Sequence, residues 1–187
     1  MGPAVAGIPD VIRRLKHMIE QMKERLPEMA KDARINWTKV LDLTQLDGLT
    51  ITQIQGAALA VAYHLNNPLL LESLQGLHPD AALMQAAKTA ASLMAMSNIY
   101  YRFVHLSEDG ELEQVPAGLR MQGMMNPGTD AVTFEVMCLA VSILNGCGAC
   151  ISAHTRQLKT HGLSVIGLSR IGKIAAVLHA VHVSLNL

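Results

Sequence analysis

Two cysteines and a histidine that share one short stretch carry the most distinctive chemistry of this sequence. Within residues 145–154, Cys147 and Cys150 are three residues apart, and His154 follows Cys150 by four. On a helix these spacings put the three side chains on one stripe, and the first turn of a helix stabilises a thiolate. The two residues between the cysteines are small and leave room for a substrate. A dithiol at a helix start beside an imidazole is what thiol–disulfide exchange requires.

A carboxylate on the preceding segment is the other candidate for this chemistry. Glu135 lies among apolar residues, 12 positions before Cys147, on the adjoining helix of an expected helical hairpin. A carboxylate in an apolar helix is costly unless it has a partner or lies at an edge, so Glu135 could reach the imidazole of His154. A position near the start of its helix, where the dipole favours an acidic residue, explains Glu135 equally well.

Two other interpretations of these residues stay open. A zinc site would use both cysteines and His154, with Glu135 or His161 as the fourth ligand. Structural zinc sites more often combine two separated ligand motifs, and the sequence has no second CxxC or HxxxH. Alternatively, the cysteines pack in the core, where cysteine is common. We interpret the third cysteine, Cys138, as a packing residue because it lies in an apolar stripe one turn beyond Glu135.

The composition excludes several classes of protein. The chain has 187 residues, 50% of them hydrophobic, which suits one compact domain. Its 15 Lys and Arg balance 15 Asp and Glu, so it lacks the long-range attraction that nucleic-acid binders use, and 3% aromatic residues are too few for base stacking. Because 16% of the residues are charged and the mean hydropathy is positive, a monomer would expose apolar patches. We therefore expect a homo-oligomer and no nucleic-acid partner.

The sequence predicts a cytoplasmic protein without a membrane segment. Its most apolar stretch, 136–151, contains Asn145 and two glycines and is shorter than the roughly 20 residues of a membrane span. Residues 1–7 lack the basic and apolar regions of a signal peptide. Three cysteines, an odd number, argue against a disulfide scaffold and leave catalysis, redox chemistry or metal binding. We expect a single domain over residues 1–187, with residues 1–9 as a flexible leader.

Apolar residues recur at helical rather than alternating spacing, which predicts an all-α domain. Thr50 and Gln53 have the spacing of a capping box, and residues 107–127 have the glycines and prolines of a long ordered loop. The expected helices cover residues 10–25, 27–41, 50–65, a short piece after Pro68, 80–104 with a break near Asn98, 130–144, 147–161 and, from Ser164 or Ser169, the stretch to Leu185. Clustered methionines are interpreted as filler of the core or of a subunit contact: Met94, Met96, Met121, Met124 and Met125.

A faint internal repeat accompanies these helices. Residues 59–62 resemble residues 139–142, 80 positions later, and residues 88–91 resemble residues 173–176, 85 positions later. Ala-rich helices also match one another easily by chance. If the repeat is real, the fold is a degenerate duplication of one helical unit, and only the second copy carries cysteines.

The spacing of Phe134-Glu135, the run LAVSILNGCGAC at 139–150 and Ala153-His154 is fairly specific, whereas a CxxC motif alone would be a weak signal. This set resembles the alkyl hydroperoxide reductase AhpD family, within the carboxymuconolactone decarboxylase-like superfamily. Further likeness brings the resemblance to most of the chain from Leu26 to Leu158. It lies in residues 26–32, 96–102, 116–121 and 126–128.

The resemblance implies an all-helical, duplicated fold that assembles as a homotrimer or a multiple of trimers. It implies a CxxC that cycles between dithiol and disulfide, with no metal and no tightly bound cofactor. By the same resemblance, Cys150 attacks the hydroperoxide or forms a mixed disulfide with a peroxiredoxin partner, and Cys147 is the proton donor and resolving cysteine. Glu135 and His154 form a proton relay. Electrons are implied to come from a dihydrolipoamide-type dithiol on a lipoyl protein.

At two points the residues and the resemblance diverge. The helix dipole favours a thiolate at Cys147, whereas the imidazole four residues further on favours Cys150, to which we assign the nucleophile. Family members often have a histidine just before the second cysteine, where this chain has Ala149. The absence of that proton-transfer group lowers the expected efficiency of direct peroxide turnover, and His179 or His182 could replace it.

The sequence thus predicts a thiol-dependent antioxidant oxidoreductase that reduces alkyl hydroperoxides through its CxxC motif. The alternative from another class is a disulfide-exchange adaptor, which passes electrons from a dithiol donor to a peroxiredoxin and itself reacts little with peroxide. A decarboxylase of the wider superfamily, whose lyase chemistry needs no CxxC, is a third hypothesis.

Overall fold

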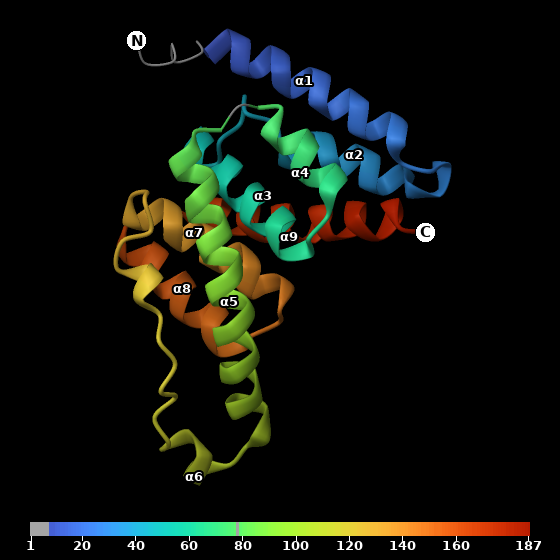
Figure 1. Ribbon diagram of the computed structural model, residues 1–187. Coiled ribbons are helices and arrows are strands. Elements are labelled where there is room, and N and C mark those ends of the chain that lie inside the picture. Colours follow the sequence, from blue (N-terminus) through green and yellow to red (C-terminus); the bar gives the residue numbers. More distant parts are fainter. Residues whose placement is uncertain (1–7, 78) are drawn as a thin grey trace.

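The computed structural model describes residues 8–77 and 79–187, and within them the chain is helical and contains no strand (Figure 1). The all-α prediction is confirmed. The elements are α1 (Ile8–Arg25), η1 (Glu28–Ala30), α2 (Lys31–Val40), α3 (Ile51–Leu65), α4 (Pro68–Gln75), α5 (Ala81–Ser107), α6 (Gly110–Glu113), η2 (Gln122–Met124), α7 (Ala131–Leu144), α8 (Gly148–Thr160) and α9 (Val165–Leu185), where η marks a 3-10 helix.

Side-chain caps set many of these helix boundaries. The Thr50 hydroxyl accepts a hydrogen bond from the Gln53 N–H at 3.1 Å, and the Gln53 side chain accepts one from the Thr50 N–H at 2.9 Å, which confirms the capping box. The N-terminal N–H groups of α5, α7 and α9 are capped by the side chains of Asp80, Asp130 and Ser164. The last helix therefore starts from the first of its two candidate serines.

Three features of the predicted helices differ from the structure, besides shifts of one to three residues at other helix ends. Helix α1 begins at Ile8, inside the expected leader, and Asp10 supports this start by pairing with Arg14 one turn on at 2.8 Å; residues 1–7 of that leader lie outside the described residues. The predicted helix 27–41 is divided into η1 and α2. Helix α5 runs unbroken through Asn98, because this side chain is buried and bonds to α7 rather than competing for its own backbone.

The predicted duplication is confirmed by the order of the helices. Helices α3, α4 and α5 recur as α7, α8 and α9, and we call these units the first and the second copy. The first two helices of each correspond at an offset of 80, and residues 53–70 and 133–150 have the same order of buried, half-buried and exposed positions. The third helices correspond at an offset of 84, from their N-caps Asp80 and Ser164, because α8 is longer than α4. The predicted second offset of 85 is one residue too long.

Helices α3 and α7 pack against each other at the centre of the core, flanked by α5 and α9 (Figure 1). Short side chains allow this close approach. A Cβ atom added to Gly56 of α3 would lie 2.5 Å from the Met137 Cε atom of α7. Buried alanines line the same helix: Ala57, Ala58, Ala60 and Ala62. The tight centre fixes the second copy on the first, and thereby fixes the helices that carry the cysteines.

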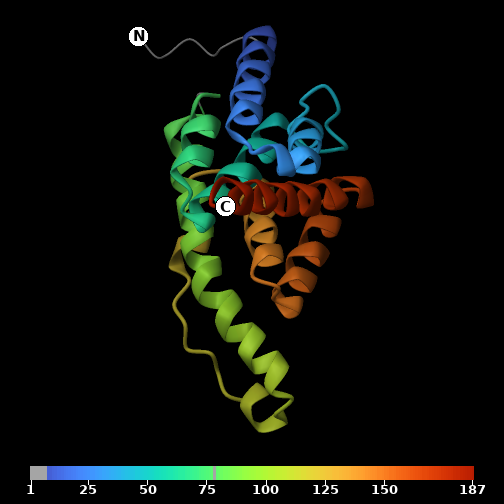
Figure 2. The same ribbon diagram turned by 90° about the vertical axis from the view of Figure 1, so that its right-hand side faces the viewer.

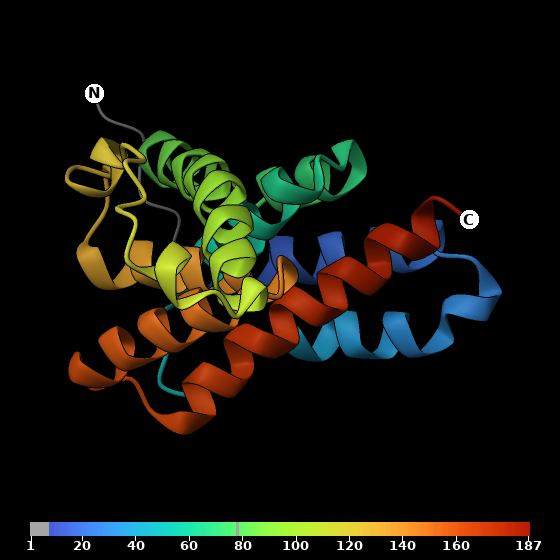
Figure 3. The same cartoon turned by 90° about the horizontal axis from the view of Figure 1, so that it is seen from below.

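Helix α9 has the length and composition of a membrane span, but in this fold it packs against α2, α3 and α7. Seen from below, it crosses the molecule diagonally beside α2 (Figure 3). Its Arg170 is only 5% exposed and pairs with Asp47 at 3.0 Å. The same guanidinium also donates to the carbonyls of Val40, Asp42 and Gln45. This buried cation holds the segment between α2 and α3 against α9.

The C-terminal half of α5 projects from the body and carries α6 at its far end (Figures 1 and 2). Residues 108–127, which we call the strap, return from there alongside α5 and are irregular apart from α6 and η2, largely as predicted. The strap meets α5 closely at Gly123, where an added Cβ atom would lie 2.9 Å from Thr89 Cγ2. The oligomer stays a prediction, and exposed apolar side chains on the C-terminal half of α5 and on the strap are consistent with it. They are Ile99, Phe103, Leu106 and Val115.

Candidate active site

The two cysteines of the CxxC motif stand at the start of α8. Cys147 is the N-cap, Cys150 lies in the first turn, and the two are joined by a disulfide with their Cα atoms 5.3 Å apart. The Cys150 N–H donates to the Cys147 sulfur at 3.3 Å, so the sulfur serves as the helix cap. Gly146, with φ of 62°, makes the turn from α7 into α8, a backbone conformation that favours glycine.

His154 and Glu135 form a buried pair between α8 and α7. His154 Nδ1 lies 2.7 Å from Glu135 Oε1, and the side chains are 10% and 16% exposed. Glu135 lies beyond the first turn of α7, so its partner, rather than the helix dipole, explains its place. Because the carboxylate engages Nδ1, the imidazole keeps Nε2 for a second proton contact.

A pocket of about 240 Å³ lies between α5, α8 and the strap. Of the two disulfide cysteines only Cys150 lines it; Cys150 is 8% exposed and Cys147 is fully buried. A small molecule in the pocket would therefore meet Cys150 first. The remaining wall is formed by Met94, Ser97, Asn98, Tyr101, Met121, Met124, Ala149, Ala153 and His154.

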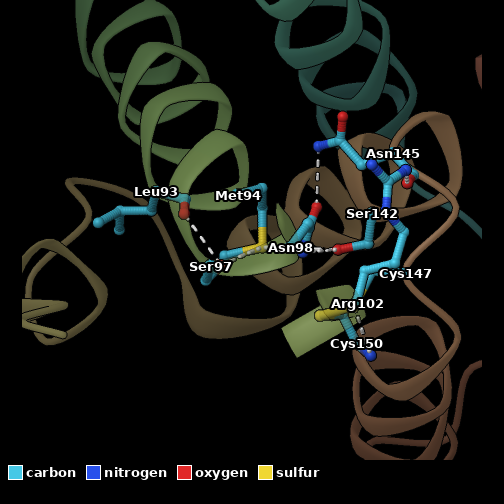
Figure 4. The surroundings of a disulfide bond; sticks show 9 residues. All are labelled: Leu93, Met94, Ser97, Asn98, Arg102, Ser142, Asn145, Cys147 and Cys150. Atoms are coloured by element: carbon cyan, nitrogen blue, oxygen red, sulfur yellow. Dashed lines mark hydrogen bonds between the residues drawn. A yellow bond between two sulfur atoms is a disulfide. The ribbon is translucent and has the colours of Figure 1, made fainter. Parts of the chain in front are cut away.

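A chain of buried and half-buried hydrogen bonds ties α5 to the turn before the cysteines (Figure 4). The Asn98 Nδ2 atom donates to Ser142 Oγ at 3.0 Å, and the Asn98 Oδ1 atom accepts from Asn145 Nδ2 at 3.1 Å. Arg102 of the same helix donates to the Asn145 carbonyl. The Ser142 carbonyl in turn accepts from the Cys147 N–H at 3.3 Å. The first copy thus holds in place the turn from which the CxxC of the second copy begins.

Sequence reasoning missed these positioning residues. Its interpretation of methionines as core filler is confirmed for Met94 and Met124, but it missed that three of them line the pocket. Met94, Met121 and Met124 face the pocket and are not only filler of the core or of a subunit contact. Asn98 is fully buried, and a polar side chain on the apolar face of a helix was the signal that could have identified it.

The other candidate residues lie apart from this pocket. Cys138 is fully buried on α7, and its burial, with a smaller effect of the Glu135 charge, raises the pKa of its thiol; this supports its interpretation as a packing residue. Neither His179 nor His182 lines the pocket, and His182 Nδ1 instead lies 2.9 Å from Asn67 Nδ2.

The ligands considered for zinc are not gathered into a metal site. His161 lies at the exposed end of α8, where its Nδ1 atom contacts the Gln157 carbonyl at 2.9 Å. Within residues 8–77 and 79–187, no group of three or more His, Cys, Asp or Glu side chains is arranged to hold a metal ion.

Comparison with known proteins agrees with the arrangement of these helices and residues. The model of the carboxymuconolactone decarboxylase family matches residues 110–185. The chain is 46% identical over 165 residues to the alkyl hydroperoxide reductase AhpD of Coxiella burnetii, a match that covers 87% of this chain and 93% of that protein. It is 43% identical over 171 residues to the AhpD of a Bradyrhizobium species, covering 90% and 93%. It is 44% identical over 168 residues to the AhpD of Rhodospirillum centenum, covering 87% and 88%. The chain therefore belongs to the AhpD family of the carboxymuconolactone decarboxylase superfamily.

Proposed function

We propose that this protein is a thiol-dependent peroxidase that reduces alkyl hydroperoxides, with Cys150 as the nucleophile. The Cys150 thiolate attacks the terminal oxygen of the hydroperoxide ROOH; an S–O bond forms, the O–O bond breaks, and the alkoxide takes a proton to leave as ROH. Cys150 becomes a sulfenic acid. The Cys147 thiolate then attacks the Cys150 sulfur; an S–S bond forms and hydroxide leaves as water after taking a proton. The peroxide has then gained two electrons and the two cysteines have lost them.

The position of the pocket carries this assignment. It reaches Cys150 and His154, whereas Cys147 is buried behind them. A buried neighbour that is already within disulfide distance suits the resolving role, because it needs no access to the peroxide.

The His154–Glu135 pair supports the proton transfers of this cycle. The carboxylate fixes the orientation of the imidazole through Nδ1. Nε2 can then accept the Cys150 thiol proton and return a proton to the leaving alkoxide. A dihydrolipoamide-type dithiol would close the cycle by two exchange steps, in which it becomes a cyclic disulfide and both cysteines become thiols again.

The test is peroxide consumption by the purified, metal-free protein with dihydrolipoamide as the electron donor and no partner protein. Turnover is expected in the wild type and is lost in Cys150→Ser. The matched variant Cys147→Ser should still consume about one equivalent of peroxide and stop at the sulfenic acid. Turnover that persists in Cys150→Ser would show that Cys150 is not the nucleophile.

A second candidate function is electron transfer to a peroxiredoxin without direct peroxide reduction. Ala149 favours it, because this residue lines the pocket beside Cys150 and has no group that transfers a proton. If dihydrolipoamide reduces the disulfide but peroxide is consumed only after a peroxiredoxin is added, the adaptor function is correct. We further propose, from the family resemblance, a homotrimer or a multiple of trimers; the cytoplasmic location stays a prediction from the sequence.

A further inference from the structure

We propose that the pocket beside Cys150 binds a compact apolar organic group and that Ala149 sets its size. The inference rests on the proposed peroxidase function. If both are correct, an organic hydroperoxide that fills the pocket oxidises Cys150 much faster than hydrogen peroxide does. Ala149 is thus a residue that determines specificity.

Two of the four polar side chains in the pocket wall, Ser97 and Asn98, are already occupied by bonds within the protein. Ser97 Oγ donates to the Leu93 carbonyl at 2.9 Å. The Asn98 side-chain amide donates a hydrogen bond to Ser142 and accepts one from Asn145 (Figure 4). A ligand therefore gains little from these groups, and a polar ligand would lose hydrogen bonds to water on entering.

Apart from Tyr101 and His154, the rest of the wall is apolar and adaptable. Met94 approaches from α5, and Met121 and Met124 approach from the strap. Unbranched thioether side chains adjust to ligands of irregular shape. The methyl groups of Ala149 and Ala153 on α8 complete the wall around Cys150. The surface next to the sulfur is thus suited to carbon rather than to water.

The size of the pocket favours an organic group. At about 240 Å³ it holds roughly eight groups of the volume of a water molecule, whereas hydrogen peroxide has only two heavy atoms. Each methylene group taken from water into such a site strengthens binding about fourfold. An organic group that fills the pocket would also hold the O–O bond at Cys150.

In the first copy a larger side chain stands at the position that matches Ala149. Ala149 is the second residue of α8, and the matching second residue of α4 is Leu69. An Ala149→Leu change therefore places in α8 the side chain that the corresponding helix of the first copy, α4, has at the same position. Leucine also has a high helix propensity, so α8 is expected to fold with it. The added isobutyl group would occupy the pocket.

The test measures the second-order rate constants for the reaction of the reduced protein with cumene hydroperoxide and with hydrogen peroxide. Each is divided by the rate constant of a free low-molecular-weight thiol with the same peroxide, and the ratio of the two quotients is compared between variants. The wild type is expected to favour cumene hydroperoxide by about tenfold or more, and Ala149→Leu to reduce this ratio to within about threefold. Ala153→Leu, which fills the pocket from the next turn of α8, should reduce it similarly. The matched control Leu69→Ala, in the first copy, should keep the wild-type ratio. A wild-type ratio near one, or an unchanged ratio in both filled variants, overturns the proposal.

A second measurement separates this inference from the peroxidase function. The alcohol 2-phenyl-2-propanol has the same organic group and no O–O bond, and its binding is measured as protection of Cys150 from iodoacetamide in the reduced protein. Protection in the wild type that weakens about tenfold in Ala149→Leu supports the site, even if no hydroperoxide is consumed and the peroxidase function fails. No protection at millimolar alcohol in the wild type overturns the site, whatever the peroxidase activity.

Discussion

The two copies of the helical unit have the same order of helices and a matching pattern of burial, but different chemistry. Residues 53–70 and 133–150 follow the same order of burial. In both copies the turn that follows the first helix contains a residue of positive φ, Asn66 at 49° and Gly146 at 62°. The next residue in each copy, Asn67 or Cys147, then caps the second helix with its side chain. The scaffold therefore supplies a shielded helix start twice, and side-chain identity alone decides what that start can do.

The side chains around the two helix starts differ in a consistent way. Asn67 accepts from the N–H groups of Leu69 and Leu70 at 3.1 Å each, which makes it a purely structural cap. In the second copy a cysteine sulfur replaces the amide, and only one N–H donates to it. The matched residues of the first and second copies are Gln55 and Glu135, Asn67 and Cys147, Leu70 and Cys150, and Leu74 and His154.

The third helix of each copy also makes different contacts with the cap residue of the second helix. His182 of α9 contacts the cap residue Asn67 directly at 2.9 Å. At the matching place in α5, Asn98 instead bonds to Ser142 and Asn145, which precede the cap. The first copy thus fixes the turn without bonding to the Cys147 sulfur. A sulfur free of such a bond can form and break a disulfide.

Exchanging Cys150 for leucine, its counterpart in the first copy, should remove most of the difference between the copies. We expect kcat/KM for hydroperoxide reduction to fall by about a thousandfold or more, because Cys150 is the only one of the three cysteines that lines the pocket. Unchanged circular dichroism would show that the fold is intact. Retained activity would move the nucleophile to another residue.

The next largest effect is expected when His154 is exchanged for leucine, its counterpart at position 74. Loss of a positioned general base typically lowers rates by about a hundredfold or more. The measurement is kcat/KM from pH 5 to pH 9, since a proton-transfer role predicts that the limb belonging to the imidazole disappears. An equally slow variant with the wild-type pH profile would show a structural role only.

Replacing Glu135 by glutamine, as in the first copy at position 55, should have a smaller effect, of about tenfold. Glutamine can still accept a hydrogen bond from Nδ1 but carries no negative charge. If the carboxylate acts through the imidazole, the double variant Glu135→Gln/His154→Leu is as slow as His154→Leu alone. Additive losses would show that Glu135 acts on its own.

The features of the two copies that depend on residues close together in the sequence could be predicted from the sequence. The Thr50–Gln53 capping box, the CxxC spacing and the offset of 80 depend on neighbouring residues or on similarity along the chain, and the structure confirms each. The pocket was not predictable in this way. Its wall combines α5, the strap and α8, which are far apart in the sequence, and methionine gives no sign of whether it faces a core or a cavity.

The polar chain from α5 was missed for the same reason. Asn98 was predicted to interrupt its helix, since asparagine often competes for the backbone. Its partners Ser142 and Asn145 lie 44 and 47 residues further on, and only the tertiary fold brings them together. Fold class and the catalytic candidates followed from periodicity and spacing, whereas the residues that position them required the packing of one copy on the other.

The packing of one copy on the other predicts that substitutions at the matched positions 98 and 182 lower the free energy of unfolding by different amounts. Asn98→Ala should lower the free energy of unfolding by about 1–3 kcal/mol, because it removes the hydrogen bonds that join the buried Ser142 hydroxyl and the half-buried Asn145 amide to α5. His182→Ala, its counterpart in α9, should cost less, because His182 is only half-buried. Chemical denaturation of both oxidised variants measures the difference. Equal losses would show that the two third helices hold their caps equally strongly.

The smallest effect is expected at Cys138, whose counterpart in the first copy is Ala58. Cys138→Ala should leave turnover within about twofold, since this cysteine does not line the pocket, and should cost about 1 kcal/mol at pH 7 through lost packing.

The pH dependence of this cost separates the buried thiol from the redox pair. Burial raises the pKa of Cys138 in the folded protein above the ordinary thiol value of 9.0. Below pH 9 the thiol is protonated in both the folded and the unfolded state, so its contribution to stability is fully present. As the pH rises past 9, the unfolded chain loses this proton first, and the wild type should lose about 1 kcal/mol relative to Cys138→Ala by pH 10. Denaturation of the oxidised proteins at pH 7 and pH 10 measures this change, because the Cys147–Cys150 disulfide does not titrate. A constant difference between the two variants would mean that the thiol is exposed to water, and the second copy would then be less tightly packed at this position than the first.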